Sequence, residues 1–62
     1  MLFTKKEVIE MMLRPHPMPK RIHKAITNDY MHNQPWDLAR IFSKETNMRL
    51  VPAGSNLFEI KY

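Results

Sequence analysis

The stretch NMRLVPAGSNLFEIKY (residues 47–62) decides the fold, because its pattern differs from that of everything before it. On both sides of PAGSN, apolar and aromatic side chains recur at every second position: Met48, Leu50, Pro52, Phe58, Ile60 and Tyr62. A period of two is typical of β-strands, whose successive side chains point to opposite faces. The stretch therefore predicts an antiparallel hairpin with strands over about 48–52 and 57–62. We expect Gly54, the only glycine, to supply a positive φ in the turn.

The residues before the hairpin are patterned for helices. Thr4-Lys5-Lys6-Glu7 has the form of a capping box, in which the threonine oxygen and the glutamate each bond an otherwise unpaired amide. Apolar residues follow at helical spacing until the prolines of RPHPMP, which forbid a helix from continuing. We therefore expect a first helix over about 4–14.

Two further helices are predicted over about 19–29 and 35–46. Each begins at a proline, which suits the first turn because its φ is already helical and it has no N–H to leave unpaired. In the second helix we expect Ile22, Ala25, Ile26 and, just beyond its end, Tyr30 to face the core. In the third we expect Leu38, Ala39, Ile41 and Phe42 to face inward, with Asn47 as the cap. A two-stranded hairpin is marginal in water by itself, so it must pack on these helices.

Composition limits the range of functions. The chain has 62 residues, 44% of them hydrophobic, and no cysteine, so we expect a single folded domain over 1–62 without disulfides or a thiolate zinc site. The opening stretch becomes charged within five residues, which predicts neither a signal peptide nor a membrane segment and favours a cytoplasmic protein. His16, His23 and His32 do not have the spacing of metal ligands, and the sequence contains neither a nucleophile motif nor a phosphate-binding glycine loop. We expect no enzymatic activity, cofactor or metal.

Positive charge is concentrated between residues 14 and 24. The net charge is +4, and this stretch contains no acidic residue but four bases, Arg14, Lys20, Arg21 and Lys24. Such a cluster can contact nucleic acid, dock an acidic protein or form a solvated helix face. We favour contact with three or four phosphates, which gives weak and salt-sensitive binding; tight binding to a specific site would require a homodimer.

The order of elements resembles that of the winged helix-turn-helix superfamily. The stretch VIEMMLRPHPMPKRIHKAI (residues 8–26) is similar to its opening, in which a first helix gives way to a proline-containing turn and a second helix. The stretch ARIFSKETNMRLVPAGSNLFEIKY (residues 39–62) is similar to its close. Among winged helices the chain most resembles HARE-type domains, which end with an arginine-bearing strand, a glycine turn and a Phe/Trp-x-Leu/Ile pattern. The resemblance implies an α+β fold, a small winged helix whose C-terminal hairpin is the wing.

The resemblance also implies where double-stranded DNA would bind. The third helix would lie in the major groove, and the wing would contact the backbone or the minor groove. Carried onto this sequence, the third helix offers Trp36, Arg40, Ser43 and Lys44, and the wing offers Arg49, Ser55, Asn56 and Lys61. Arginine can contact guanine with two hydrogen bonds, and lysine can contact phosphate.

Three side chains are candidates for contact with a protein partner. Trp36 falls on the polar side of the third helix, where it either anchors a partner or folds back into the core; we favour the core. Met18 and Met31 flank the second helix and suit an adaptable protein-binding surface.

These features favour a small DNA-binding regulator. The alternative is a protein-binding adaptor or inhibitor that acts on a cellular or host component of transcription or replication machinery. Asp37, near the start of the third helix, and the long connector before that helix favour this alternative. By analogy, short basic proteins of this kind are often carried by bacteriophages or mobile elements. RNA binding has weaker support, because the sequence shows no aromatic-rich exposed sheet.

Overall fold

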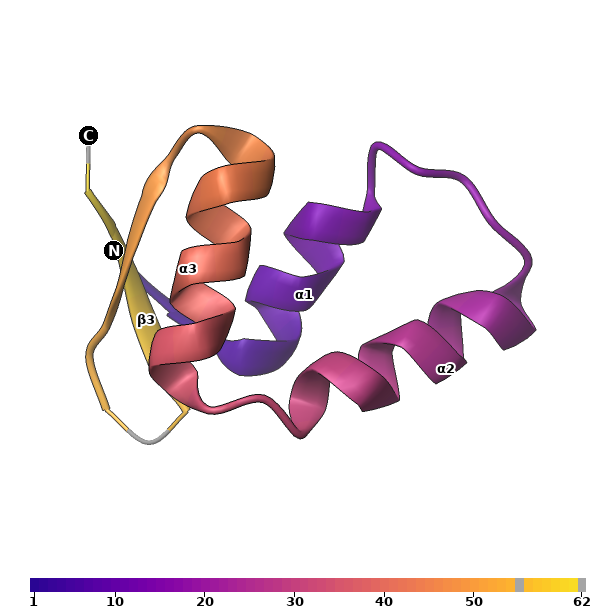
Figure 1. Ribbon diagram of the computed structural model, residues 1–62, viewed down its shortest axis with the longest axis horizontal. Helices are drawn as coiled ribbons and strands as arrows, with labels where there is room; N and C mark the ends of the chain where they lie inside the picture. The colour runs from indigo at the N-terminus through magenta and orange to yellow at the C-terminus, as the bar shows by residue number, and fades with distance from the viewer. Residues whose placement is uncertain (55, 62) are drawn as a thin grey trace.

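The computed structural model describes residues 1–54 and 56–61. Its elements, in chain order, are β1 (Leu2–Thr4), α1 (Lys5–Leu13), α2 (Lys20–Met31), α3 (Pro35–Thr46), β2 (Arg49–Pro52) and β3 (Leu57–Lys61) (Figure 1). The α+β class and the order of three helices followed by a hairpin are confirmed. Tyr62, predicted at the end of the last strand, and Ser55, predicted as a wing contact, lie outside the described residues.

The strand β1 was not predicted. It pairs antiparallel with β3, and β3 pairs antiparallel with β2, so the sheet has the order β1-β3-β2. Phe3 lies opposite Phe58, and Leu50 lies opposite Ile60. Three residues are too few for a period of two to be visible in the sequence. Because β3 is paired on both sides, the hairpin is built into a sheet and does not depend on its own two strands alone.

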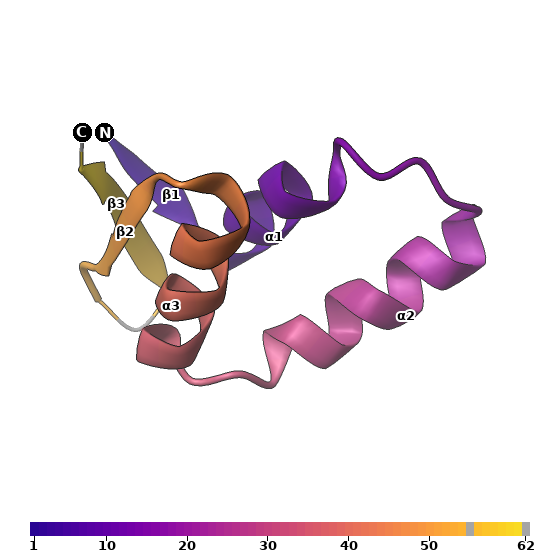
Figure 2. The same ribbon diagram turned by 45° about the horizontal axis from the view of Figure 1, so that its top comes forward.

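The core lies between the inner face of the sheet and the helices α1 and α3. The largest fully buried side chains are Phe42, Phe58, Ile9, Leu38 and Val8. In Figure 2 the sheet lies on one side of α3, and α3 packs against β2 and α1. The inward positions predicted for Leu38, Ala39 and Phe42 are confirmed, because the helical spacing of apolar residues places them on one face.

The capping box at the start of α1 is confirmed in both directions. The Thr4 hydroxyl accepts a hydrogen bond from the Glu7 N–H at 3.2 Å, and the Glu7 carboxylate accepts one from the Thr4 N–H at 2.8 Å. These two bonds satisfy amides that a helix leaves unpaired at its first turn. The helix then ends at Leu13, next to the proline-containing connector.

The helix α2 stands apart from the rest of the fold. It packs mainly against α1, and every one of its residues is at least partly exposed (Figure 1). Its half-buried residues are His23, Ile26, Thr27 and Tyr30, which recur at helical spacing and face the body of the protein. The predicted inward positions of Ile22 and Ala25 are therefore wrong, since both side chains are exposed. A helix that touches one neighbour buries a narrow stripe, which apolar spacing alone did not locate.

Lys5 joins α1 to the end of α2 and to the hairpin. Its ammonium donates hydrogen bonds to the carbonyl oxygens of Met31 and Asn33, each at 2.6 Å. Its backbone N–H donates to the carbonyl oxygen of Asn56 at 3.1 Å. The last carbonyl groups of a helix lack intrahelical partners and carry its negative partial charge, so a cation there is favourable. One largely buried side chain therefore fixes the C-terminal end of α2 beside the start of α1.

The left-handed backbone position is at Asn47 and not at Gly54. Asn47 has φ 59° and ends α3, with its N–H bonded to the Ser43 carbonyl at 3.0 Å, which confirms it as the cap. Within the described residues Gly54 has no positive φ, so that expectation is wrong. The Ala53 N–H bonds to the Leu57 carbonyl at 2.8 Å, and the reversal is thus longer than a two-residue hairpin turn.

We predict that Gly54→Ala changes stability little, whereas Asn47→Ala destabilises the protein. A Cβ added at Gly54 would meet the Leu57 Cβ at 3.9 Å, an ordinary contact. Alanine at position 47 would be forced into the left-handed region at a cost of about 1–2 kcal/mol. Urea unfolding of both variants measures the difference. A larger loss for Gly54→Ala than for Asn47→Ala would contradict this assignment.

We also predict that Lys5→Met destabilises the fold by about 1.5–3 kcal/mol, because two carbonyl groups lose a charged donor while the aliphatic stem is kept. The matched control is Lys6→Met, which removes the same charge from an exposed position on α1. Thermal unfolding of both variants compares them. Equal stability of the two variants would show that the Lys5 ammonium does not support the fold.

Candidate functional site

The outward face of α3 presents a row of three large side chains. Trp36, Arg40 and Lys44 are each four residues apart, so they lie above one another on one side of the helix, and all three are exposed. The opposite side of α3 carries the buried Leu38 and Phe42. The core packing of α3 therefore determines which way this row points.

Arg40 pairs with Asp37 on the same helix. Its guanidinium donates to the Asp37 carboxylate at 3.0 Å, and 78% of the Arg40 side chain remains exposed. Asp37 lies in the first turn of α3, where a negative charge is favourable to the helix dipole. An exposed ion pair of this kind is weak, so Arg40 is free to exchange the carboxylate for another anion.

Ser43, which the family resemblance places in the groove, has a structural role instead. Its hydroxyl donates to the Ala39 carbonyl at 2.8 Å and accepts the Leu50 N–H at 3.1 Å. It is half-buried where α3 meets β2, and it satisfies an amide on the outer edge of that strand. The expectation that Ser43 faces outward is therefore wrong.

The hairpin adds a second set of polar groups. Arg49 lies opposite Lys61 in the sheet register and is exposed. The Lys61 ammonium bonds the Glu59 carboxylate at 3.0 Å, and this bond lowers the pKa of the Glu59 carboxyl. Asn56 is exposed at the turn, and its backbone carbonyl accepts the Lys5 N–H. Arg49 and the Asn56 side chain are thus the hairpin groups most open to a ligand.

Three cations lie at the beginning of α2. Lys20, Arg21 and Lys24 are exposed, and the amino-terminal end of α2 lies at the opposite end of the molecule from the sheet (Figures 1 and 2). Among the described residues no side chain caps this helix, whose N-cap is Pro19. Positive charges at a helix N-terminus oppose the helix dipole. Helix stability therefore does not account for these residues.

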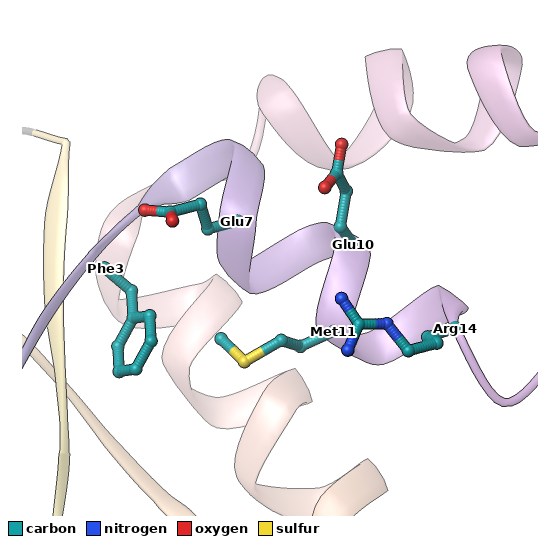
Figure 3. A pocket seen from close by; sticks show the side chains of 5 residues that line it. All are labelled: Phe3, Glu7, Glu10, Met11 and Arg14. Atoms are coloured by element: carbon teal, nitrogen blue, oxygen red, sulfur yellow. The ribbon is translucent and has the colours of Figure 1, made fainter.

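Arg14 has different surroundings from the α2 cations. It lines a hollow of about 270 Å³ on α1 and β1, together with Phe3, Glu7, Glu10 and Met11. Figure 3 shows Met11 extending toward Phe3, while the Arg14 side chain lies back along α1. Two carboxylates in the same hollow offset the charge of Arg14. The basic segment recognised in the sequence is thus divided in space, with its strongest part on α2.

The three candidates for protein contact differ in exposure. Trp36 is 64% exposed, so the prediction that it completes the core is wrong; a regular α3 places it opposite the fully buried Leu38. Met31 is 41% exposed, and it flanks the α2–α3 connector together with Trp36. Met18 is half-buried against the core.

Lys5 sets the position of that connector. Its ammonium donates hydrogen bonds to the carbonyl of Met31, the last residue of α2, and to the carbonyl of Asn33 in the connector. The sequence indicates only that Lys5 stands within a capping box. Its role depends on where α2 ends, which is a property of the folded chain.

No family model, curated protein or solved structure matches this chain. Among the described residues, no three His, Cys, Asp or Glu side chains gather as metal ligands would. In the same part of the chain, no helix combines the length and apolar character needed to cross a membrane.

We predict that the fluorescence emission of Trp36, the only tryptophan, shifts little when the protein unfolds, because the indole is already in water. Trp36→Ala is likewise expected to change the free energy of unfolding by less than about 0.5 kcal/mol. Emission spectra in buffer and in denaturant, with unfolding curves of the variant, measure both. A large blue shift on folding would place the indole in the core.

Proposed function

We propose that this chain is a small winged-helix protein that binds double-stranded DNA and has no enzymatic activity. The exposed cations at the beginning of α2 carry the proposal: Lys20, Arg21 and Lys24. The first N–H groups of a helix have no partner within the helix, and these groups and the helix dipole favour an anion at its start. Added to the net charge of +4, this end of α2 suits the phosphates of a nucleic acid.

The order of elements supports the winged-helix assignment. Three helices precede the β2–β3 hairpin, and α3 exposes Arg40 and Lys44 on the face away from the core. In this arrangement α3 is the recognition helix and the hairpin is the wing, with Arg49 and Asn56 as its contacts. The strand β1 precedes α1 and completes the sheet beside β3.

The two groups of contacts fit on one duplex. The α2 cations lie at one end of the molecule, and α3 and the hairpin lie toward the other (Figure 1). The protein measures 30 × 22 × 18 Å, whereas one turn of DNA is about 34 Å long. The distance between the two groups is therefore shorter than one turn of DNA. With so few cations, the affinity of one protein molecule is weak, and a homodimer would be needed for a tightly bound site.

Protein binding is the second candidate function. The observation that favours it is the exposure of Trp36 and Met31 on either side of the connector that Lys5 holds. Tryptophan is enriched among residues that dominate binding energy, and methionine adapts to varied surfaces. An adaptor or inhibitor of transcription or replication machinery would use this surface.

We predict that the protein binds a short labelled DNA duplex with an affinity that falls steeply with salt. Replacing Lys20, Arg21 and Lys24 together by glutamine removes three phosphate contacts. This change should make the fall of log affinity with log salt less steep, by about 2.7 in slope, or about 0.9 per contact. Fluorescence anisotropy at several salt concentrations measures the slope, and Lys6→Gln is the matched control from α1.

The absence of duplex binding at protein concentrations on the order of tens of micromolar in low salt would defeat the proposal. An unchanged slope in the triple variant would remove α2 from the interface. Retention of a partner protein from nuclease-treated lysate, combined with no DNA binding, would support the adaptor function instead.

A further inference from the structure

We infer that Trp36 is a stacking platform for an unpaired base, so that α3 contacts single-stranded nucleic acid. This inference rests on the proposed nucleic-acid binding and adds a class of ligand to it. The observation is an indole that is 64% exposed on a helix whose opposite side is fully packed. The core contains Phe42, Phe58 and Leu38 at zero exposure and does not use Trp36. The indole is therefore available for a ligand.

The indole is held on a rigid element. Trp36 lies in the first turn of α3, directly after Pro35, which is half-buried at the helix start. Proline fixes the backbone there, and the tryptophan side chain has only two rotatable bonds. Little conformational freedom is lost when a flat ligand covers the ring. A planar base is such a ligand, and every base presents a π-face.

The charges beside Trp36 identify a polyanion as the occupant. Arg40 and Lys44 follow on the same face at helical rises of about 6 and 12 Å from Trp36. A strand whose base stacks on the indole can therefore run along α3 with its phosphates near both cations. An apolar protein segment would make no favourable contact with these two cations. Asp37 is bonded to Arg40 at 3.0 Å, and that pairing offsets its charge.

The geometry of stacking explains why the base on the Trp36 indole must be unpaired. Inside a closed duplex both faces of each base are covered by neighbouring bases, so an indole cannot reach them without unstacking. A single strand exposes the faces of its bases all along its length at no such cost, whereas a blunt duplex exposes only those of its terminal base pairs. We thus expect the cations of α2 to contact the phosphates of a duplex and of a single strand alike, and Trp36 to distinguish between the two ligands.

Trp36 is the only tryptophan, so its own fluorescence reports the contact. We predict that a single-stranded oligothymidylate quenches the emission, and that a blunt duplex of equal length quenches it much less. Both titrations use the full chain at low salt. Equal quenching by the two probes would overturn the inference, because the indole would then not select unpaired bases.

Variants separate stacking from general apolar contact. Trp36→Ala should weaken binding of labelled oligothymidylate by roughly 5- to 150-fold, which corresponds to one stacked base. Trp36→Phe keeps an aromatic ring and should recover most of the affinity. Leu2→Ala, which removes an exposed apolar side chain from β1, is the control and should leave the affinity unchanged. Anisotropy of the labelled oligonucleotide measures all three.

The outcomes distinguish this inference from the proposed function. Salt-sensitive duplex binding without quenching by the single strand, and with Trp36→Ala equal to the parent protein, would overturn the stacking role and leave duplex binding intact. Quenching by the single strand without any duplex binding would support the stacking role and defeat the duplex proposal. If neither probe binds in low salt, both proposals fail.

Discussion

The arrangement of the helices depends on the ammonium group of Lys5. A cation loses water when it is buried, and hydrogen bonds to Met31 and Asn33 replace that water. Met31 is the last residue of α2 and Asn33 lies in the connector just after it, where unpaired acceptors and the negative end of the helix dipole meet. Since α2 has no fully buried residue, apolar packing holds it only along its contact with α1. The Lys5 bonds supply the directional contact that packing lacks.

This constraint separates two parts of the surface. The C-terminal end of α2 is fixed beside α1 and the hairpin turn, so its amino-terminal end projects away from the sheet with Lys20, Arg21 and Lys24 (Figure 2). The same anchor sets the connector 32–34 from which α3 starts, and with it the position of Trp36. The prediction of a long connector is wrong, because α2 continues to Met31. The junction therefore fixes the direction of α2, whose far end carries the cations, and the start of α3, which carries the aromatic ring. The nucleic acid that we propose as the ligand would contact the cations with its phosphates and the ring with its bases.

Local patterns in the sequence predicted most of the elements. The bounds of α3, the capping box at Thr4 and the hairpin follow from spacing and caps, which act over a few residues. What the sequence did not indicate depends on contacts between distant segments. The pairing of β1 with β3, the face by which α2 meets α1, and the bonds of Lys5 are of this kind.

The candidate site was predicted in part, for the same reason. The outward positions of Arg40 and Lys44 follow from helical periodicity. Ser43 looked equally polar, but its hydroxyl is used by the adjoining strand, which periodicity along one helix does not reveal. Trp36 looked like a core residue because small proteins seldom leave an indole in water. Its exposure is a consequence of the regular geometry of α3, whose other side is already filled by Phe42.

NMR of the Lys5 side chain tests most directly whether its ammonium holds the end of α2. In uniformly labelled protein, a hydrogen-bonded ammonium exchanges slowly with water and shows correlations from Nζ across the hydrogen bonds to the carbonyl carbons of Met31 and Asn33. The bonds described here predict both signatures for Lys5 and neither for the exposed Lys6. A Lys5 ammonium that exchanges as fast as that of Lys6, without correlations to those carbonyls, would contradict the proposed role of Lys5 in positioning α2.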